Sequence, residues 1–271
     1  PVRWGTTRIW NPVDFVNAQR KDPLAIFDAR PGIPLVKLHV PFEDVADGAN
    51  VYAIAQMDDA GTLGDVGGLL RAEVSVGPTE TGLNVALRRE QPLRVGADFS
   101  GGLGPLELRF EGALSHGGDQ YTWDGPLVLD PNAPEFPTKR DRSEDWIPQG
   151  TAGVEWGIAY GDDDTLYLTL EYFYNDAGYG DESVYPWLAF QGDFSPLYLG
   201  RHYVGLGVAL PRPGDWNDTT LLATGISNLS DQSTIARLDY QVQVLTRLRV
   251  YCFIAAHFGE QGEFRFEVDV P

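Results

Sequence analysis

Apolar and polar residues alternate along most of this chain. The segment 105–116 shows the pattern in its simplest form, with the order Leu106, Glu107, Leu108, Arg109, Phe110 and Glu111. A repeat of two residues is typical of a β-strand whose two faces lie in different environments. Because the polar positions carry both signs of charge, we expect strands with one apolar face and one densely charged face.

The alternation predicts about fourteen strands and no convincing helix, apart from a short turn near residues 13–18. Short connections rich in Gly, Pro and Asp separate many of the strands. Three long segments, 10–32, 117–149 and 177–199, are expected on a single edge of an up-and-down sheet. The predicted strands cover residues 1–9, 33–42, 50–57, 68–77, 81–90, 92–100, 105–116, 151–160, 165–175, 200–210, 219–229, 233–243, 246–258 and 262–270.

Two architectures fit this pattern. In a soluble β-sandwich or barrel, the charged face is the outer surface. In an antiparallel transmembrane β-barrel, the apolar face meets lipid and the charged face lines a wet interior. The length of the strands, the aromatic residues near their ends and the asymmetry of the loops favour the second, an all-β single barrel domain over residues 1–271. No run approaches the roughly 18 apolar residues of a membrane-spanning helix, and a barrel needs none.

Charge and composition narrow the class of partner. The chain has 20 Lys and Arg against 39 Asp and Glu, a net charge of -19. Such a surface repels a phosphate polymer, which argues against nucleic acid as a partner. It suits a solvated, loop-rich surface or a cation-tolerant pore. The chain begins at Pro1 without a signal peptide, so we expect it to start inside a longer precursor.

Two stretches carry a resemblance to a known group. One is Trp4-Gly5-Thr6-Thr7-Arg8-Ile9-Trp10-Asn11-Pro12-Val13-Asp14-Phe15, and the other runs from Gly200-Arg201-His202-Tyr203 to Asn228-Leu229-Ser230-Asp231. Together they resemble Gram-negative outer-membrane porin-like proteins, in the style of alginate-export barrels. The resemblance implies an outer-membrane location and a complete barrel of about 16 to 18 strands, with N-terminal strands absent from this chain. It also implies that the Trp4 element ends a strand and enters a loop.

The charged face supplies the candidate functional residues. Rows of opposed charges across a pore select solutes by charge, and Arg237, Arg247, Arg249 and Arg265 could form a basic ladder on neighbouring strands. The alternative hypothesis is that these residues only form ion pairs with one another and make the barrel wall rigid. The residues expected to line the pore are Arg71, Glu73, Arg88, Arg94, Glu107, Arg109, Glu111, Glu155, Glu171, Arg237, Asp239, Arg247, Arg249, Arg265 and Glu267.

The sequence offers little for catalysis or metal binding. The four His residues are scattered without ligand spacing, and no Gly-x-Ser-x-Gly element is present. We therefore predict no enzyme, no catalytic or metal-binding residue and no cofactor. A hydrolase acting on outer-membrane lipid or polysaccharide stays open as a lesser alternative, with His202 near Ser227 or Asn228.

The expected function is a channel for passive diffusion or export of small hydrophilic or charged solutes. Its other expected partners are outer-membrane lipid and lipopolysaccharide, and a homo-oligomer or a larger outer-membrane complex. The main alternative is a non-conducting scaffold or anchor whose lumen is plugged by its own loops or by a partner. The long loop 117–149 is a candidate to fold inward and narrow the pore.

Overall fold

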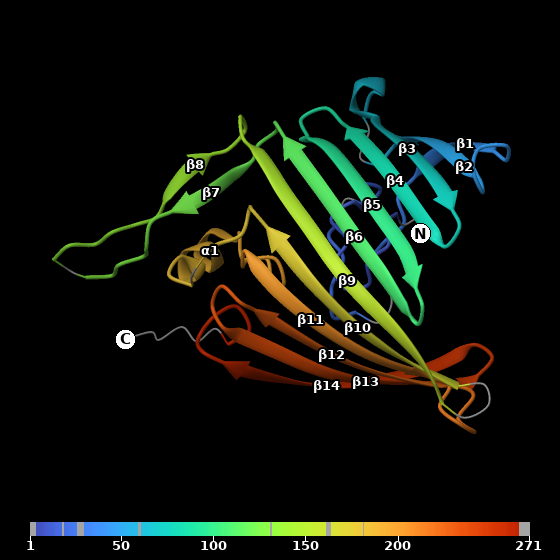
Figure 1. The fold of residues 1–271 in the computed structure, drawn as a ribbon. Helices are drawn as coiled ribbons and strands as arrows, with labels where there is room; N and C mark the ends of the chain where they lie inside the picture. The colour runs from blue at the N-terminus through green and yellow to red at the C-terminus, as the bar shows by residue number, and fades with distance from the viewer. Residues whose placement is uncertain are drawn as a thin grey trace.

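The protein is all-β, with one large antiparallel sheet of twelve strands and a separate two-stranded hairpin (Figure 1). The computed structural model describes residues 4–17, 19–25, 30–58, 61–130, 132–160, 164–180 and 182–265. Neighbours in the large sheet are neighbours along the chain, except that β6 pairs with β9 around the hairpin β7–β8. This up-and-down order lets each strand bury its backbone groups against the next one in sequence.

Short elements outside the sheet are one α-helix, α1 Tyr185–Gln191, and a 3-10 turn, Leu63–Asp65. Pro186 near the start of α1 and a left-handed Gly192 at its end delimit the helix. The strands are β1 Leu35–Phe42, β2 Ala49–Gln56, β3 Gly67–Val76, β4 Thr79–Leu87, β5 Leu93–Leu103, β6 Leu106–His116, β7 Tyr121–Asp124, β8 Thr138–Asp141, β9 Trp146–Tyr160, β10 Asp164–Asn175, β11 His202–Pro211, β12 Thr219–Asn228, β13 Ser233–Leu245 and β14 Leu248–Gly259.

Twelve of the predicted strands are confirmed, namely those that became β1 to β6 and β9 to β14. The two predicted at the ends of the chain are wrong wherever the structure describes them. Residues 4–9 form no strand, because their backbone amides bond to side chains of the sheet. Residues 262–265 contain only an isolated bridge between Gly262 and Arg265. The remainder of the predicted last strand, including Glu267, lies outside the described residues.

The register of the sheet places apolar side chains on one face. Val154 of β9, for example, lies between Leu108 of β6 and Leu170 of β10. Along all twelve strands, the only Asp, Glu, Lys or Arg on this face is Asp164, at the very start of β10. Its large side chains are exposed: Leu170 is 50% exposed and Leu206 is 52% exposed. The predicted separation into an apolar and a charged face is therefore confirmed.

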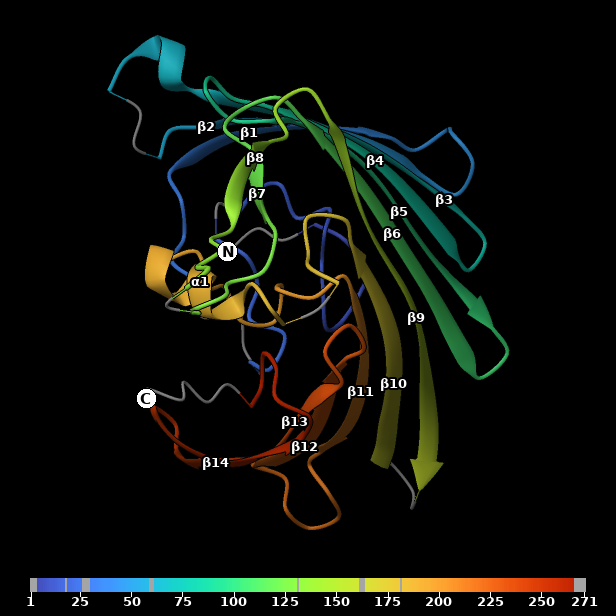
Figure 2. The same ribbon diagram turned by 90° about the vertical axis from the view of Figure 1, so that its left-hand side faces the viewer.

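The other face is concave and covered. Figure 2 shows the sheet curled into a trough, with the N-terminal part of the chain lying inside it. We call the described residues between 4 and 34 the inner segment. It supplies Trp4, Val13, Phe15 and Val16 to one buried cluster with β2, β3 and β6, and Ile9 and Trp10 to a second. The prediction that 10–32 forms a loop on the edge is therefore wrong, because its apolar side chains are buried against the sheet.

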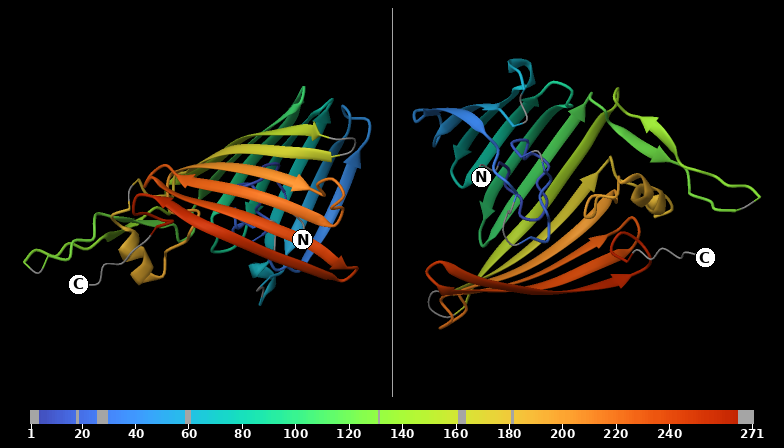
Figure 3. Two further views of the ribbon diagram at one scale, coloured as in Figure 1. Left: turned by 90° about the horizontal axis from the view of Figure 1, so that it is seen from below. Right: turned by 180° about the vertical axis from the view of Figure 1, so that it is seen from behind.

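Connections between strands differ in length at the two ends of the sheet, where the strands begin and end. At one end, adjacent strands are joined by the short connections 77–78, 104–105 and 246–247. At the other end, the long connections are 117–145 and 176–201. The expectation that the second and third long segments share an edge is confirmed. The hairpin β7–β8 projects away from the sheet (Figures 1 and 3), so the hairpin itself does not fold into the trough. The sheet is open between its edge strands β1 and β14.

Candidate functional site on the concave face

Two buried carboxylates of the sheet hold one turn of the inner segment. Glu111 of β6 accepts the backbone N–H groups of Thr6 at 2.6 Å and Thr7 at 2.7 Å. Glu171 of β10 accepts those of Arg8, Ile9 and Trp10, the last two at 2.8 Å and 3.2 Å. Five consecutive amides are thus bound by side chains instead of a neighbouring strand. Charged acceptors make these hydrogen bonds stronger than neutral ones.

A third carboxylate between them is neutralised by two arginines. Glu155 of β9 contacts Arg8 of the inner segment at 3.0 Å and Arg109 of β6 at 3.0 Å. Arg109 also lies 2.7 Å from Glu107 on its own strand. The guanidinium of Arg8 is half exposed, while that of Arg109 is buried. This chain of alternating charges joins the inner segment to the wall and satisfies the charges that the wall buries.

A similar network lies on the first strands. Arg71 of β3 binds Asp98 of β5 through two nitrogens, at 2.5 Å and 2.9 Å, and Glu73 at 2.9 Å. Asn84 of β4 accepts from Arg71 at 3.0 Å and donates to Asp98 at 3.1 Å. The guanidinium of Arg71 also lies 5.7 Å from the ring of Trp4 in the inner segment. Sequence reasoning found Arg71 and Glu73 but not the bidentate pairing of Arg71 with Asp98 across β3 and β5.

Aromatic packing fixes the inner segment between these charged anchors. Trp10 is fully buried, with its ring 5.3 Å from that of Phe173 and 5.7 Å from that of Tyr203. The wall leaves room for it at Gly205 of β11, where an added Cβ would lie 2.6 Å from Ile9 and 2.9 Å from the Trp10 ring. The absence of a side chain at Gly205 is thus required for this close approach.

A second anchor follows β14. The Glu263 carboxylate accepts the Tyr203 hydroxyl at 2.6 Å, the Asn228 amide at 2.9 Å and the backbone N–H of Leu197. Asn228 also donates to Asp231 at 2.8 Å. Burial raises the pKa of Glu263 to about 7, and the neighbouring Asp231 acts in the same direction against the hydrogen bonds. The residues after β14 therefore return to the concave face.

The other residues that were expected to line the pore lie at the margins of the concave face. Arg88 follows β4, and its guanidinium contacts the Asp58 carboxylate at 3.1 Å. Arg237 pairs with Asp239 on β13 at 2.8 Å and stacks on Phe253 at 4.0 Å. Both pairs satisfy their own charge, which agrees with the reading of these residues as ion pairs within the wall.

The predicted basic ladder is spread along the full length of the last strands. Arg247 lies in the turn before β14, and Arg249 lies opposite Gln243. Arg237 lies opposite Ala255, and Arg265 comes after β14, where it donates to the carbonyl of Gly259 at 3.0 Å. These four residues are therefore distributed along the strand direction, from one end of β13 and β14 to the other.

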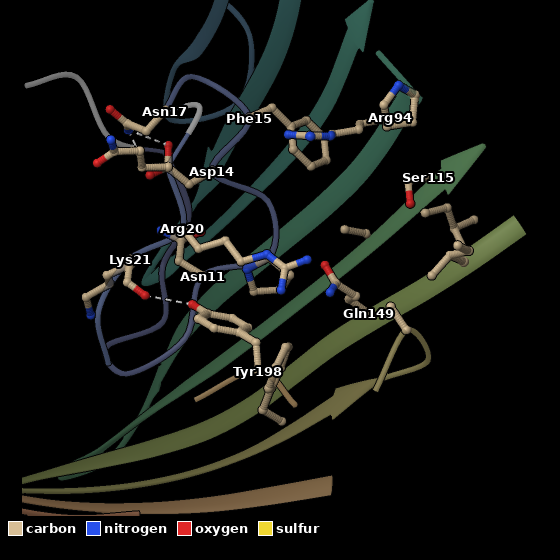
Figure 4. Close-up of a pocket in the computed structure, with 18 of the residues that line it drawn as sticks. Asn11, Asp14, Phe15, Asn17, Arg20, Lys21, Arg94, Ser115, Gln149 and Tyr198 are labelled. Carbon is tan, nitrogen blue, oxygen red and sulfur yellow. Dashed lines mark hydrogen bonds between the residues drawn. The ribbon is translucent and has the colours of Figure 1, made fainter. Parts of the chain in front are cut away.

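A polar cavity of about 270 Å³ lies between the inner segment and the wall. Figure 4 shows Arg20 reaching from the inner segment toward Gln149 of β9, with Arg94 of β5 above them in this view. Asp14 is the single carboxylate lining it among the described residues, and its oxygens are bound by Asn17 and Arg30. Burial raises the pKa of Asp14 in spite of these partners. Sequence analysis named Arg94 but missed Arg20.

The residues considered for catalysis do not form a nucleophile and base. The His202 ring nitrogen bonds to the Tyr172 hydroxyl at 2.6 Å, and Ser227 bonds to Thr234 at 2.8 Å. No group of three or more His, Cys, Asp or Glu residues suited to a metal ion occurs in the described ranges. Within those same ranges, none of the helical structure is both long and apolar enough to traverse a bilayer.

Comparison of the chain with protein-family models, with curated proteins and with solved structures finds no match in any of the three.

Sequence reasoning missed the inner segment and the anchor Glu263, whereas Glu111 and Glu171 were predicted on the charged face without their role as acceptors. Residues 1–16 contain Trp4, Ile9, Trp10, Val13, Phe15 and Val16 in irregular spacing. An apolar stretch with many aromatics and a broken period of two is a signal for buried, non-strand chain. Nothing local in the sequence identifies Glu111 and Glu171 as its acceptors.

Proposed function

We propose that this chain forms the wall of an outer-membrane β-barrel channel whose lumen is narrowed by the inner segment. The solutes are small and hydrophilic, and they pass over a surface of charged and amide side chains. The observation that carries the proposal is the outward face of the sheet, which presents exposed apolar side chains along twelve strands with a single charge at its margin.

Water is a poor environment for such a face. Proteins that stay monomeric in water rarely expose an apolar patch beyond a few hundred Å². Here Leu70, Leu83, Leu170, Leu206 and Ile254 are each at least 50% exposed and lie on strands from one side of the sheet to the other. Lipid is a favourable environment for this surface, and the charged concave face would then line a hydrated interior.

The position of two tryptophans on β9 supports the same proposal. Trp146 and Trp156 share the outward face, separated by Pro148, Gly150, Ala152 and Val154. Ten residues span about 33 Å along a strand, and a tilt of about 40° reduces this to about 25 Å along the membrane normal. The apolar band of an outer-membrane barrel has about this height, with aromatic residues at both of its borders.

Closure of the barrel is part of the proposal. β1 and β14 are exposed along almost their whole length, with unpaired backbone groups at both edges of the sheet. Unpaired edges are unfavourable in lipid. We propose that further strands complete a barrel of about 16 to 18 strands, the number that the resemblance to porin-like proteins implies. At this size, a barrel leaves an aqueous lumen.

The inner segment also supports a second candidate, a non-conducting scaffold or anchor. The amides of residues 6–10 are bound firmly to the wall by Glu111 and Glu171, and Trp10 is fully buried. A segment held in this way could obstruct the lumen completely. A hydrolase has less support, because the ring of His202 bonds to the Tyr172 hydroxyl, while the Ser230 hydroxyl accepts the backbone N–H of His202.

Conductance of the full-length protein in planar bilayers separates these candidates. A channel gives steady current steps, and a salt gradient across the membrane gives a reversal potential that reports its charge selectivity. Folded protein that inserts without any conductance would refute the channel and favour the scaffold. Recovery of the protein from cells in the aqueous fraction, and not with the outer membrane, would refute both.

A further inference from the structure

Two arginines that face one cavity have no counter-charge among the residues that the structure describes. Arg94 comes from β5 and Arg20 from the inner segment, and both line the cavity of about 270 Å³. Neither guanidinium forms an ion pair or a hydrogen bond with any described residue. Arg20 lies instead over the ring of Tyr198 at 4.9 Å. Their like charges repel each other.

Three other arginines of the wall behave differently. Arg71, Arg109 and Arg237 each contact at least one carboxylate within 3.0 Å. Arg20 and Arg94 share one cavity without such a contact, although the chain has a net charge of -19. Arg94 is half-buried, and a cation in this position without a partner is costly, because burial removes part of its hydration. Arg20 is exposed and adds a second positive charge at the same cavity. A bound anion would offset this cost.

The other charges at the cavity are already engaged. Arg30 bonds to the Asp14 carboxylate at 2.7 Å, and Lys21 donates to the backbone carbonyl of Ile9 at 3.1 Å. The single lining carboxylate, Asp14, is therefore directed at Arg30 and Asn17. This leaves Arg20 and Arg94 as the groups whose charge is presented to the cavity.

We infer that this cavity is a binding site for a small oxyanion, a carboxylate or phosphate group held between Arg20 and Arg94. The planar, forked guanidinium group suits two-point hydrogen bonding to either kind of oxyanion. Amide side chains such as Gln149 and Asn17 line the same cavity and suit polar groups next to the anion. A bound anion would link the inner segment to β5 by charge. This site does not depend on whether the barrel conducts.

Calorimetric titration of the folded, full-length protein in detergent at low ionic strength tests the site. Succinate and inorganic phosphate serve as separate probes. We expect saturable one-to-one binding of at least one of them, weakened by added NaCl because the attraction is partly exposed to screening. Binding of succinate alone identifies a carboxylate site, phosphate alone a phosphate site, and both a general oxyanion site.

Variants connect any binding to the two arginines. Arg94→Gln and Arg20→Gln should each weaken binding by about tenfold or more, the usual effect of losing a charge-assisted hydrogen bond. Arg94→Lys, which keeps the charge but loses the fork, should weaken it less. Arg247→Gln, in the exposed turn before β14, is the matched control and should leave binding unchanged.

Folding of each variant is checked by its heat-dependent migration on a gel, so that a loss of binding is not confused with a loss of structure. The inference is overturned if folded wild-type protein binds neither probe. It is also overturned if Arg20→Gln and Arg94→Gln bind as tightly as the wild type. In both cases a conducting channel would still leave the proposed function in place.

Discussion

Glu111 and Glu171 divide between them the backbone amides of a single turn of the inner segment. Glu111 takes those of Thr6 and Thr7, and Glu171 takes the three that follow. The two carboxylates come from β6 and β10, which flank β9. Gly153 of β9 provides space for the side chain of Glu171, because an added Cβ there would lie 2.7 Å from it. The wall is thus shaped to hold this turn.

Removing these acceptors should loosen the inner segment. Glu111→Ala and Glu171→Ala each leave buried amides without a partner, at an expected cost of about 1–3 kcal/mol. We expect faster cleavage of the inner segment by trypsin, whose sites there include Arg8, Arg20 and Lys21, and a larger conductance if the segment narrows a pore. Glu90→Ala, on an exposed connection, is the control. Cleavage at the wild-type rate in both variants would contradict the anchoring role.

A charge on the outward face should prevent insertion if that face meets lipid. Leu170 lies in the middle of β10, between Val154 and Leu206. Leu170→Arg at this depth is expected to cost about 2–4 kcal/mol, measured as a lower yield of folded, heat-modifiable protein in vesicles. Leu129→Arg is the matched control, because Leu129 is 71% exposed in the long connection 117–145. Equal folding of the two variants would be incompatible with a lipid-facing sheet.

A side chain at Gly205 should collide with the inner segment. Its Cβ would lie within 3 Å of Ile9 and Trp10, whereas at Gly225 of the neighbouring strand β12 no atom lies within 4 Å. Gly205→Val is expected to lower the free energy of unfolding by about 1–3 kcal/mol through overpacking. Gly225→Val should change it little. Urea unfolding monitored by circular dichroism measures both, and equal midpoints would show that the Trp10 contact is dispensable.

The anchor at Glu263 should weaken as the pH rises. Its pKa is about 7 in the folded protein and higher than in the unfolded chain. At a pH below the pKa of Glu263 in the unfolded chain, this carboxyl group is protonated in both the folded and the unfolded state. Between roughly pH 4.5 and 7, the unfolded state loses its proton first, so stability falls with increasing pH. We expect a lower urea midpoint at pH 8 than at pH 5.

Glu263→Gln separates this effect from other titrations, since its amide oxygen still accepts the Tyr203 hydroxyl but does not ionise. The difference between the two pH values should shrink in this variant. A pH dependence identical to that of the wild type would show that another group is responsible. Asp231, Tyr185 and Tyr203 are titratable neighbours of this anchor.

The twelve strands of the sheet could be predicted because their signal is local. A strand such as β6 sets its two faces by alternation alone, and hairpin pairing of successive strands then places Leu108, Val154 and Leu170 side by side. For the same reason, the sequence correctly assigned Arg71, Glu111 and Glu171 to the charged face. Helix α1 and the hairpin β7–β8 were missed, since both are short and lie within long connections.

The sequence by itself therefore determined the strands, the two faces of the sheet and the end of the strands at which the long connections after β6 and β10 lie. Only the tertiary structure decided what the concave face holds. Thr6 and Trp10 are separated from Glu111 and Glu171 by more than a hundred residues, and no local period encodes such a pairing. Arg20 and Arg94 meet at one cavity for the same reason, because the curvature of the sheet brings together charges that are distant in the chain.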